Sequence, residues 1–274
     1  MIRLHPVKQF RLPVVAECIN PNIFESKTLE EIQKLTLWEG NKQKRLCELF
    51  NTEEIKHENE TESIKITING DLSRVRKIGW GMRSGELIIN GATGMHLGEE
   101  MRGGRIVVNG NVGGWAGSMM KGGTIEIHGN AGDYLAAPYR GSIEGMRGGK
   151  VTVHGNAGNE VGAKMKKGVI EVHGSAGQFV GFRMCNGIIF VRGDCSKRAG
   201  ACMTDGKIIV AGNLKSVIPT FTIDSIRPRV KIEEGNIAEG PFYVFVGDLG
   251  ENGNGKLYIS KNENPQLIIH EAIL

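Results

Sequence analysis

The hydrophobic and polar positions in the middle of the chain recur with a period of 19 residues. Complete units of this length begin at Glu86, Arg105, Lys150, Val169 and Ile188. Two irregular units, 65–85 with two extra residues and 124–149 with seven extra, belong to the same series, and a partial eighth unit begins at Lys207. A fixed period near twenty residues is typical of a solenoid, in which each repeat stacks on the next.

Each unit opens with a short alternation of apolar and polar residues. The second and fourth positions are Ile, Leu or Val in every unit, as at Ile106 and Val108. This period of two predicts a strand with one buried face. Position six is always glycine, which suits a turn with positive φ or a close approach of two backbones. Position sixteen is methionine in every complete unit, and we expect this column of side chains to fill the core.

These patterns predict an all-β protein. A 19-residue unit is too short for a pair of helices or a propeller blade, and it fits one coil of a right-handed parallel β-helix, a solenoid of about eight coils. We divide the chain into an N-terminal cap or arm (1–62), the β-helix (63–217) and C-terminal strands that form a second cap (218–274). Caps are expected because an uncovered coil edge would pair with other chains.

The two flanking segments carry their own signals. Residues 28–31 form a capping box that predicts a short helix toward Leu35. Segments 219–224, 242–246 and 256–260 are predicted to be strands.

Composition and charge exclude several classes of protein. The 40 glycines among 274 residues follow the repeat rather than a collagen period. No run of 18 apolar residues predicts a membrane span, and the N-terminus lacks the apolar core of a signal peptide, so a cytoplasmic location is expected. Five cysteines in no regular pattern argue against a disulfide framework. A net charge of +4 without a recognition motif argues against a nucleic-acid partner.

Motifs for catalysis or metal binding are weak. The segment 250–256 has the glycine and lysine spacing of a phosphate-binding loop, but Leu257 stands where Ser or Thr would hold Mg²⁺, so we predict a hairpin loop. A second candidate is a column of histidines, for which we expect no carboxylate to complete a metal site and favour a polar ladder. The column consists of His128, His154 and His173. No catalytic residue and no metal ligand is therefore predicted.

Two outward columns are candidates for binding. Position seventeen is basic in five consecutive units, and this row either extends into solvent or faces an acidic partner or anionic chain. The row consists of Arg83, Arg102, Lys121, Arg147 and Lys166. Position eleven is rich in aromatic residues and is either a protein interface or a partly buried corner. With the seven-residue insertion, which lies within 133–145, it supplies the candidate interface residues Trp115, Tyr134, Pro138, Tyr139 and Phe179.

The glycine spacing of the repeat, as in 110–117, resembles that of two families: the C subunit of formylmethanofuran dehydrogenase and the C-terminal domain of the glutamate synthase large subunit. The flanks favour the first family. They are similar to the ends of the dehydrogenase C subunit over segments 19–32, 37–41, 46–50 and 257–265.

The resemblance implies a non-catalytic structural subunit of a cytoplasmic complex in archaea. That complex reduces CO₂ and transfers the formyl group to methanofuran, the first step of methanogenesis from CO₂. A tungsten or molybdenum pterin, a dinuclear metal site and iron–sulfur clusters would belong to the metal-pterin, amidohydrolase-like and ferredoxin-like partner subunits, with no cofactor in this chain. The acidic, glutamyl-rich tail of methanofuran is one anion that the basic row would suit.

Two alternatives share the repeat. One is the C subunit of the bacterial formyltransferase/hydrolase complex, which lacks the metal-pterin centre. The other is a stand-alone glutamate synthase-type domain that works with a glutaminase and a flavin subunit. An independent β-helical carbohydrate enzyme would need clustered carboxylates on one face, and the columns predict none.

Overall fold

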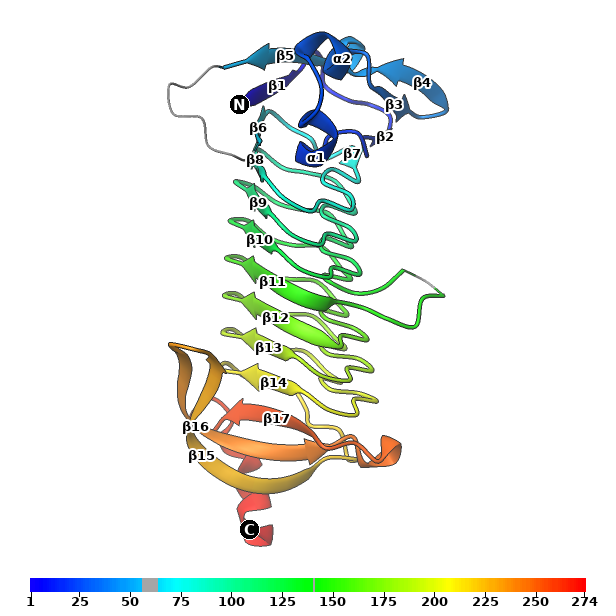
Figure 1. The fold of residues 1–274 in the computed structure, drawn as a ribbon. Helices are drawn as coiled ribbons and strands as arrows, with labels where there is room; N and C mark the ends of the chain where they lie inside the picture. Colours follow the sequence, from blue (N-terminus) through cyan, green and yellow to red (C-terminus); the bar gives the residue numbers. More distant parts are fainter. Residues whose placement is uncertain (56–63, 140) are drawn as a thin grey trace.

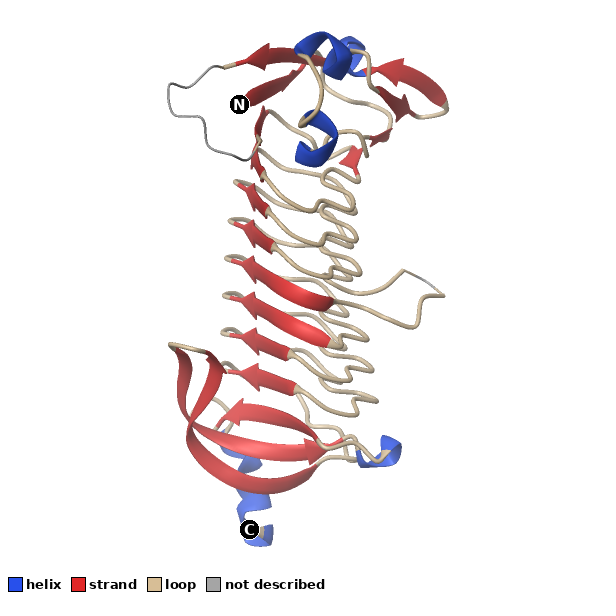
Figure 2. Ribbon diagram, in the orientation of Figure 1, coloured by secondary structure: helices blue, strands red, loops and turns tan. Residues whose placement is uncertain are grey.

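The computed structural model describes residues 1–55, 64–139 and 141–274. Its described part is mostly β, with a mixed sheet of 13 strands and a second sheet of four strands (Figures 1 and 2). The large sheet has the order β15-β16-β17-β14-β13-β12-β11-β10-β9-β8-β6-β1-β5. The all-β prediction is confirmed.

Eight strands of the large sheet come from the repeats and stack in sequence order (Figure 1). Neighbouring strands are parallel and in register by repeat position, so that Ile106 pairs with Ile125. The strands are β6 (Lys65–Asn69), β8 (Glu86–Asn90), β9 (Arg105–Val108), β10 (Thr124–Ile127), β11 (Arg147–Val153), β12 (Lys167–Val172), β13 (Ile188–Val191) and β14 (Lys207–Val210).

The repeats also contact one another along two further lines of backbone. Single parallel bridges join position eight of successive repeats, from Leu72 and Thr93 to Leu214. At position seventeen the amide donates to the carbonyl of position sixteen one repeat earlier, as from Lys121 to Met101 at 2.7 Å. Each 19-residue unit is therefore fixed to its predecessor at several points, which explains why the sequence period is kept so strictly.

The core of the stack consists of the inward columns. Positions two and four and the seven methionines of position sixteen, from Met82 to Met203, are buried. The glycines of position six allow close backbone approach: a Cβ on Gly110 would lie 2.5 Å from the carbonyl oxygen of Gly91. Positive φ is needed at another glycine column, where Gly98 has a φ of +60°. The methionine prediction and the glycine interpretation are both confirmed.

The N-terminal segment extends the sheet and adds a small second one. β1 (Ile2–Pro6) pairs parallel with β6 and antiparallel with β5 (Phe50–Glu54). The predicted capping box is present, with Thr28 and Glu31 bonded to each other's backbone, and its helix ends at Gln33 rather than near Leu35. The other elements are β2 (Val14–Val15), α1 (Pro21–Phe24), α2 (Leu29–Gln33), β3 (Thr36–Glu39), β4 (Lys42–Arg45), α3 (Leu46–Leu49) and β7 (Val75–Arg76).

The C-terminal segment covers the other end of the stack (Figure 1). β17 (Gly255–Ser260) pairs parallel with β14, and β16 (Asn236–Gly247) pairs antiparallel with β17 and with β15 (Thr222–Glu233). The phosphate-loop-like segment, 250–256, overlaps η1 (Leu249–Glu251) and leads from the end of β16 into antiparallel β17, so the hairpin prediction is confirmed. The last element is η2 (Pro265–Ile273).

The predicted strands at 242–246 and 256–260 are present, whereas the strand predicted at 219–224 begins only at Thr222. The boundary predicted between residues 62 and 63 lies outside the described residues. Among the described helices, none is both long and apolar enough to cross a membrane.

Candidate functional site

The cations of the basic row form an ordered column, because four of their amides, those of Arg102, Lys121, Arg147 and Lys166, bond in succession to the preceding repeat. The amide of Arg83, at the start of the row, donates instead to Oδ1 of Asn22. Arg83, Arg102, Arg147 and Lys166 are exposed, and Lys121 is half-buried. The column therefore lies along one side of the stack. After Lys166 the same position holds Cys185 and Thr204, which are also exposed but are not basic residues.

Three of these cations form ion pairs within the chain. Lys121 contacts Glu100 at 3.0 Å, and both Arg147 and Lys166 contact Glu144 at 2.6 Å. Glu144 belongs to the insertion, so the basic row fastens the end of that loop to the stack. The bond from Lys166, assisted by the charge of Arg147, holds the pKa of the Glu144 carboxyl below its usual range.

Arg83 and Arg102 differ from the other three. Neither has an acidic ion-pair partner within the described residues. An anion approaching Lys121 or Arg147 must compete with a carboxylate already in place, whereas the described part of the chain offers no such competitor at Arg83 and Arg102.

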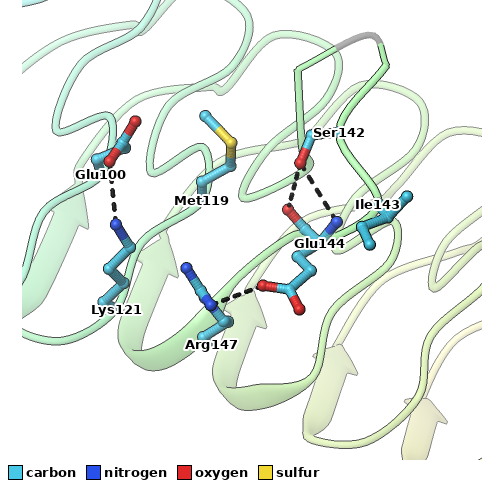
Figure 3. Close-up of a pocket in the computed structure, with 7 residues that line it drawn as sticks. All are labelled: Glu100, Met119, Lys121, Ser142, Ile143, Glu144 and Arg147. Carbon is cyan, nitrogen blue, oxygen red and sulfur yellow. Dashed lines mark hydrogen bonds and ion pairs between the residues drawn. The ribbon is translucent and has the colours of Figure 1, made fainter.

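A pocket of about 320 Å³ opens where the row meets the insertion (Figure 3). Lys121 and Arg147 supply cations to it, and Glu100 and Glu144 supply the carboxylates that pair with them. The other lining residues are Met119, Ser142 and Ile143. Ile143, in the insertion, is 80% exposed.

The aromatic column is stacked ring on ring in the first half of the molecule. Trp115 lies between His96 at 5.4 Å and Tyr134 at 4.4 Å, measured between ring centroids, with interplanar angles of 14°. Tyr139 of the insertion stacks on the other side of His96 at 5.2 Å. His96 is buried and Trp115 and Tyr134 are half-buried, whereas Tyr139 is exposed and Pro138 beside it is half-buried.

The same column continues differently after the insertion. Phe179 is half-buried, and the guanidinium of Arg198 lies 5.1 Å from its ring centroid. Phe182 packs edge-on against Phe179, with Arg183 above it at 5.3 Å. The structure thus brings Trp115, Tyr134, Pro138 and Tyr139 together at the insertion, whereas Phe179 belongs to a separate cation–π cluster.

Buried polar groups lie beneath the stacked rings. Glu99 is 4% exposed, and its Oε2 approaches Nδ1 of His96 at 3.3 Å without hydrogen-bond geometry. Lys77 occupies the aromatic column one repeat earlier and pairs with Glu17 at 2.8 Å, which raises the pKa of the lysine. Lys77 was missed in the sequence because its repeat has two extra residues that shift the register.

The histidine column has a carboxylate beside it, which the repeat pattern of the sequence did not indicate. Oε1 of Glu126 lies 3.1 Å from Nε2 of His154 and 3.7 Å from Nε2 of His128. Glu126 sits at the outward third position of its strand, where the alternation alone does not distinguish a ligand from an ordinary surface residue. The signal available in the sequence was its spacing of two residues from His128.

We define the insertion face as the exposed surface made by the basic row, the stacked rings and the insertion. It carries the exposed side chain of Ile143, the stacked aromatic rings and the guanidinium groups of Arg83 and Arg102.

Comparisons with known proteins agree with this description. No family model matches the chain. It is 45% identical over 95 residues to the C subunit of the molybdenum-containing formylmethanofuran dehydrogenase 1 of Methanothermobacter marburgensis, a match over 35% of this chain and 23% of the relative. It is 39% identical over 99 residues to the C subunit of the tungsten-containing formylmethanofuran dehydrogenase 2 of Methanothermobacter wolfeii, over 35% of this chain and 36% of that one.

A solved structure matches over nearly the whole length. A chain of the formyltransferase/hydrolase complex (FhcABCD) from Methylorubrum extorquens, solved in complex with methylofuran, superposes with a TM-score of 0.84 and 28% identity. The match covers 94% of this chain and 99% of the other. The resemblance to the C subunit of formylmethanofuran dehydrogenase is confirmed, although the aligned part spans only about a quarter of the length of the first curated relative.

Proposed function

We propose that the chain is the structural C subunit of a formylmethanofuran dehydrogenase complex, in which it binds sister subunits and performs no chemistry of its own. The observation that carries the proposal is the similarity of the whole fold to a chain of a solved formyltransferase/hydrolase complex. Sequence similarity to dehydrogenase C subunits favours the dehydrogenase form of that assembly.

The scaffold itself is proposed to be a right-handed parallel β-helix. In support, three lines of backbone contact repeat at the 19-residue period, and the strands between β6 and β14 are all parallel. We further propose that residues 1–62 and 218–274 act as caps, since β1 and β17 each pair with a terminal strand of the stack. Such caps prevent edge-to-edge association of the sheet.

The cofactors of the complex are proposed to lie in other subunits. The relatives are named as molybdenum-containing and tungsten-containing enzymes, which supports a metal-pterin subunit as one of the partners. A dinuclear hydrolase-like subunit and iron–sulfur proteins are the further partners that the family implies. We propose a cytoplasmic assembly that acts in one-carbon metabolism and delivers the formyl group to methanofuran.

The insertion face is the surface proposed to bind these partners. Ile143 and Tyr139 are both exposed, as expected of interface anchors, and Tyr139 stacks on the ring of His96. Arg83 and Arg102 are proposed to hold either an acidic segment of a sister subunit or the acidic tail of the carrier. The solved relative belongs to a complex crystallised with methylofuran, which supports a furan carrier as a ligand of the assembly.

The bacterial formyltransferase/hydrolase complex is the second candidate assembly, and the solved relative favours it directly. Both candidates give this chain the same structural role and differ in whether a metal-pterin subunit is present. The glutamate synthase alternative depends on the shared glycine repeat alone.

Mild affinity purification of the tagged chain from its host, with mass spectrometry and metal analysis of the eluate, tests the proposal. Recovery of pterin-dehydrogenase and amidohydrolase-like subunits together with molybdenum or tungsten is the expected result. A hydrolase and a formyltransferase without either metal would indicate the bacterial type. Recovery of a glutaminase and a flavin subunit, or of the chain alone, would contradict the proposal.

A further inference from the structure

The histidine column lies on the strand side of the stack, outside the insertion face. His128 and His154 follow β10 and β11, and their rings are parallel with centroids 4.6 Å apart. Glu126 reaches both from within β10. Ligand atoms of these three residues all lie within 4.8 Å of one another.

The separations fit the dimensions of a bound transition metal. A tetrahedral ion with ligands at about 2.0–2.1 Å places its ligand atoms roughly 3.3 Å apart. The distances from Glu126 Oε1 to the two imidazole nitrogens, 3.1 and 3.7 Å, bracket that value. Two imidazoles and a carboxylate are also a donor set that zinc and its neighbours in the first transition row accept.

The carboxylate is already oriented for such a role. Arg105 donates to Oε2 of Glu126 at 3.0 Å, which leaves Oε1 toward the histidines. An outer partner that fixes a ligating carboxylate in this way is a common feature of metal sites.

One ring must turn before both nitrogens can reach a single ion. An imidazole binds a metal in its own plane, and the rings of His128 and His154 are stacked with an interplanar angle of 1°. The side chain of His128 is 46% exposed, and the terminal torsion of histidine is broad. The imidazole of His128 can therefore rotate out of its stacking contact with His154 and turn its Nε2 toward the ion.

The neighbouring repeat provides a contrast. Glu171 and His173 stand in the same two columns, with their nearest atoms 3.5 Å apart. There Arg192 donates through Nε and Nη2 to the same oxygen, Oε1, that faces the histidine. The oxygen that Glu126 keeps available is thus occupied by a guanidinium at Glu171.

We propose that Glu126, His128 and His154 form a binding site for a divalent first-row transition metal, with Zn²⁺ as the representative ion. Three protein ligands leave a fourth position open to water. The site is independent of the proposed scaffold role and of the cofactors assigned to partner subunits.

The test is calorimetric titration of Zn²⁺ into the full chain, prepared without a histidine tag and with the exposed thiols removed by Cys47→Ser and Cys185→Ser. The expected result is one zinc ion per chain. His154→Ala, His128→Ala and Glu126→Gln are each expected to weaken binding at least tenfold. His173→Ala is the matched control and is expected to leave the dissociation constant within twofold.

The outcomes separate clearly. Equal zinc binding by the parent chain and the His154→Ala variant would overturn the proposal, and so would a loss in His173→Ala as large as that in His154→Ala. Because all four altered side chains are partly exposed, circular dichroism and the melting temperature are expected to remain unchanged. A variant that lost its fold would be replaced by His154→Gln, which keeps a polar side chain but offers no imidazole.

Discussion

The halves of the stack before and after the insertion share their interior and differ in their exterior. Met101 and Met120 precede the insertion, Met184 and Met203 follow it, and all four side chains are fully buried. The strands pair with the same register in both halves. The inward columns thus specify the same coil structure in each of the eight repeats.

The aromatic column changes at the insertion, and the basic row ends one repeat after it. Before it, stacked rings around Trp115 and a row of cations line one side of the molecule. After it, Arg198 covers the ring of Phe179 in the aromatic column, whereas the row of cations continues through Arg147 and Lys166 before Cys185 and Thr204 follow. The repeat therefore specifies the scaffold, and departures from the repeat mark the surface that is specific to this protein.

The largest expected effect is on the shared interior. Met120→Ala and Met184→Ala each remove a buried side chain from a closely packed column and are expected to lower the free energy of unfolding by about 2–5 kcal/mol. Similar losses in chemical denaturation would confirm that the two halves are equivalent inside. A loss confined to one half would contradict that equivalence.

The next largest effect is on assembly of the complex, and we expect it to differ between the two halves of the stack. Trp115→Ala or Ile143→Ser is expected to weaken retention of sister subunits by tenfold or more, since central anchors contribute most to an interface. Phe179→Ala, in the other half, is expected to have a smaller effect. Quantitative pull-down of the complex measures all three, and an equal loss from Phe179→Ala would place the interface along the whole column.

A smaller effect concerns Arg83 and Arg102. The double variant Arg83→Ser and Arg102→Ser is expected to raise the KM for the furan carrier severalfold or to release a sister protein, because each guanidinium pairs with an anion. Lys197→Ser is a control, since it removes an exposed cation from the other half. Unchanged carrier kinetics and unchanged assembly in the double variant would show that these arginines are only solvated.

The smallest effect is the pH dependence of the insertion. The lowered pKa of Glu144 means that its pairs with Arg147 and Lys166 are fully present above about pH 4.5 and are lost as the pH falls through the lower folded value. Hydrogen exchange of residues 141–147, corrected for intrinsic rates, is expected to increase at that point. Glu144→Gln is expected to show the faster exchange already at pH 7, and its failure to do so would exclude this anchor.

Much of the fold was predictable because its signals are local and repeated. Alternating Ile and Val, the methionine column and the capping box at Thr28 each depend on residues close together in the chain. The insertion of β1 between β5 and β6 was not predictable, since it joins residues 44 to 64 positions apart. Its residues show no periodicity that links them to the repeats.

The candidate site was predictable only in part. The basic row and the aromatic column followed from the register of the repeat. The pairing of Glu144 with two of those cations depends on how the insertion folds back, and the approach of Glu126 to His154 depends on side-chain conformation across neighbouring repeats. Neither of these two contacts corresponds to a repeat position that holds the same type of residue in successive units.

Hydrogen–deuterium exchange of the chain alone and in its isolated complex tests most directly the claim that the insertion face binds the sister subunits. The account predicts strong additional protection at 133–139 and 141–147 on assembly and little change at 179–204. Protection confined to 179–204, or no change at the insertion, would contradict it.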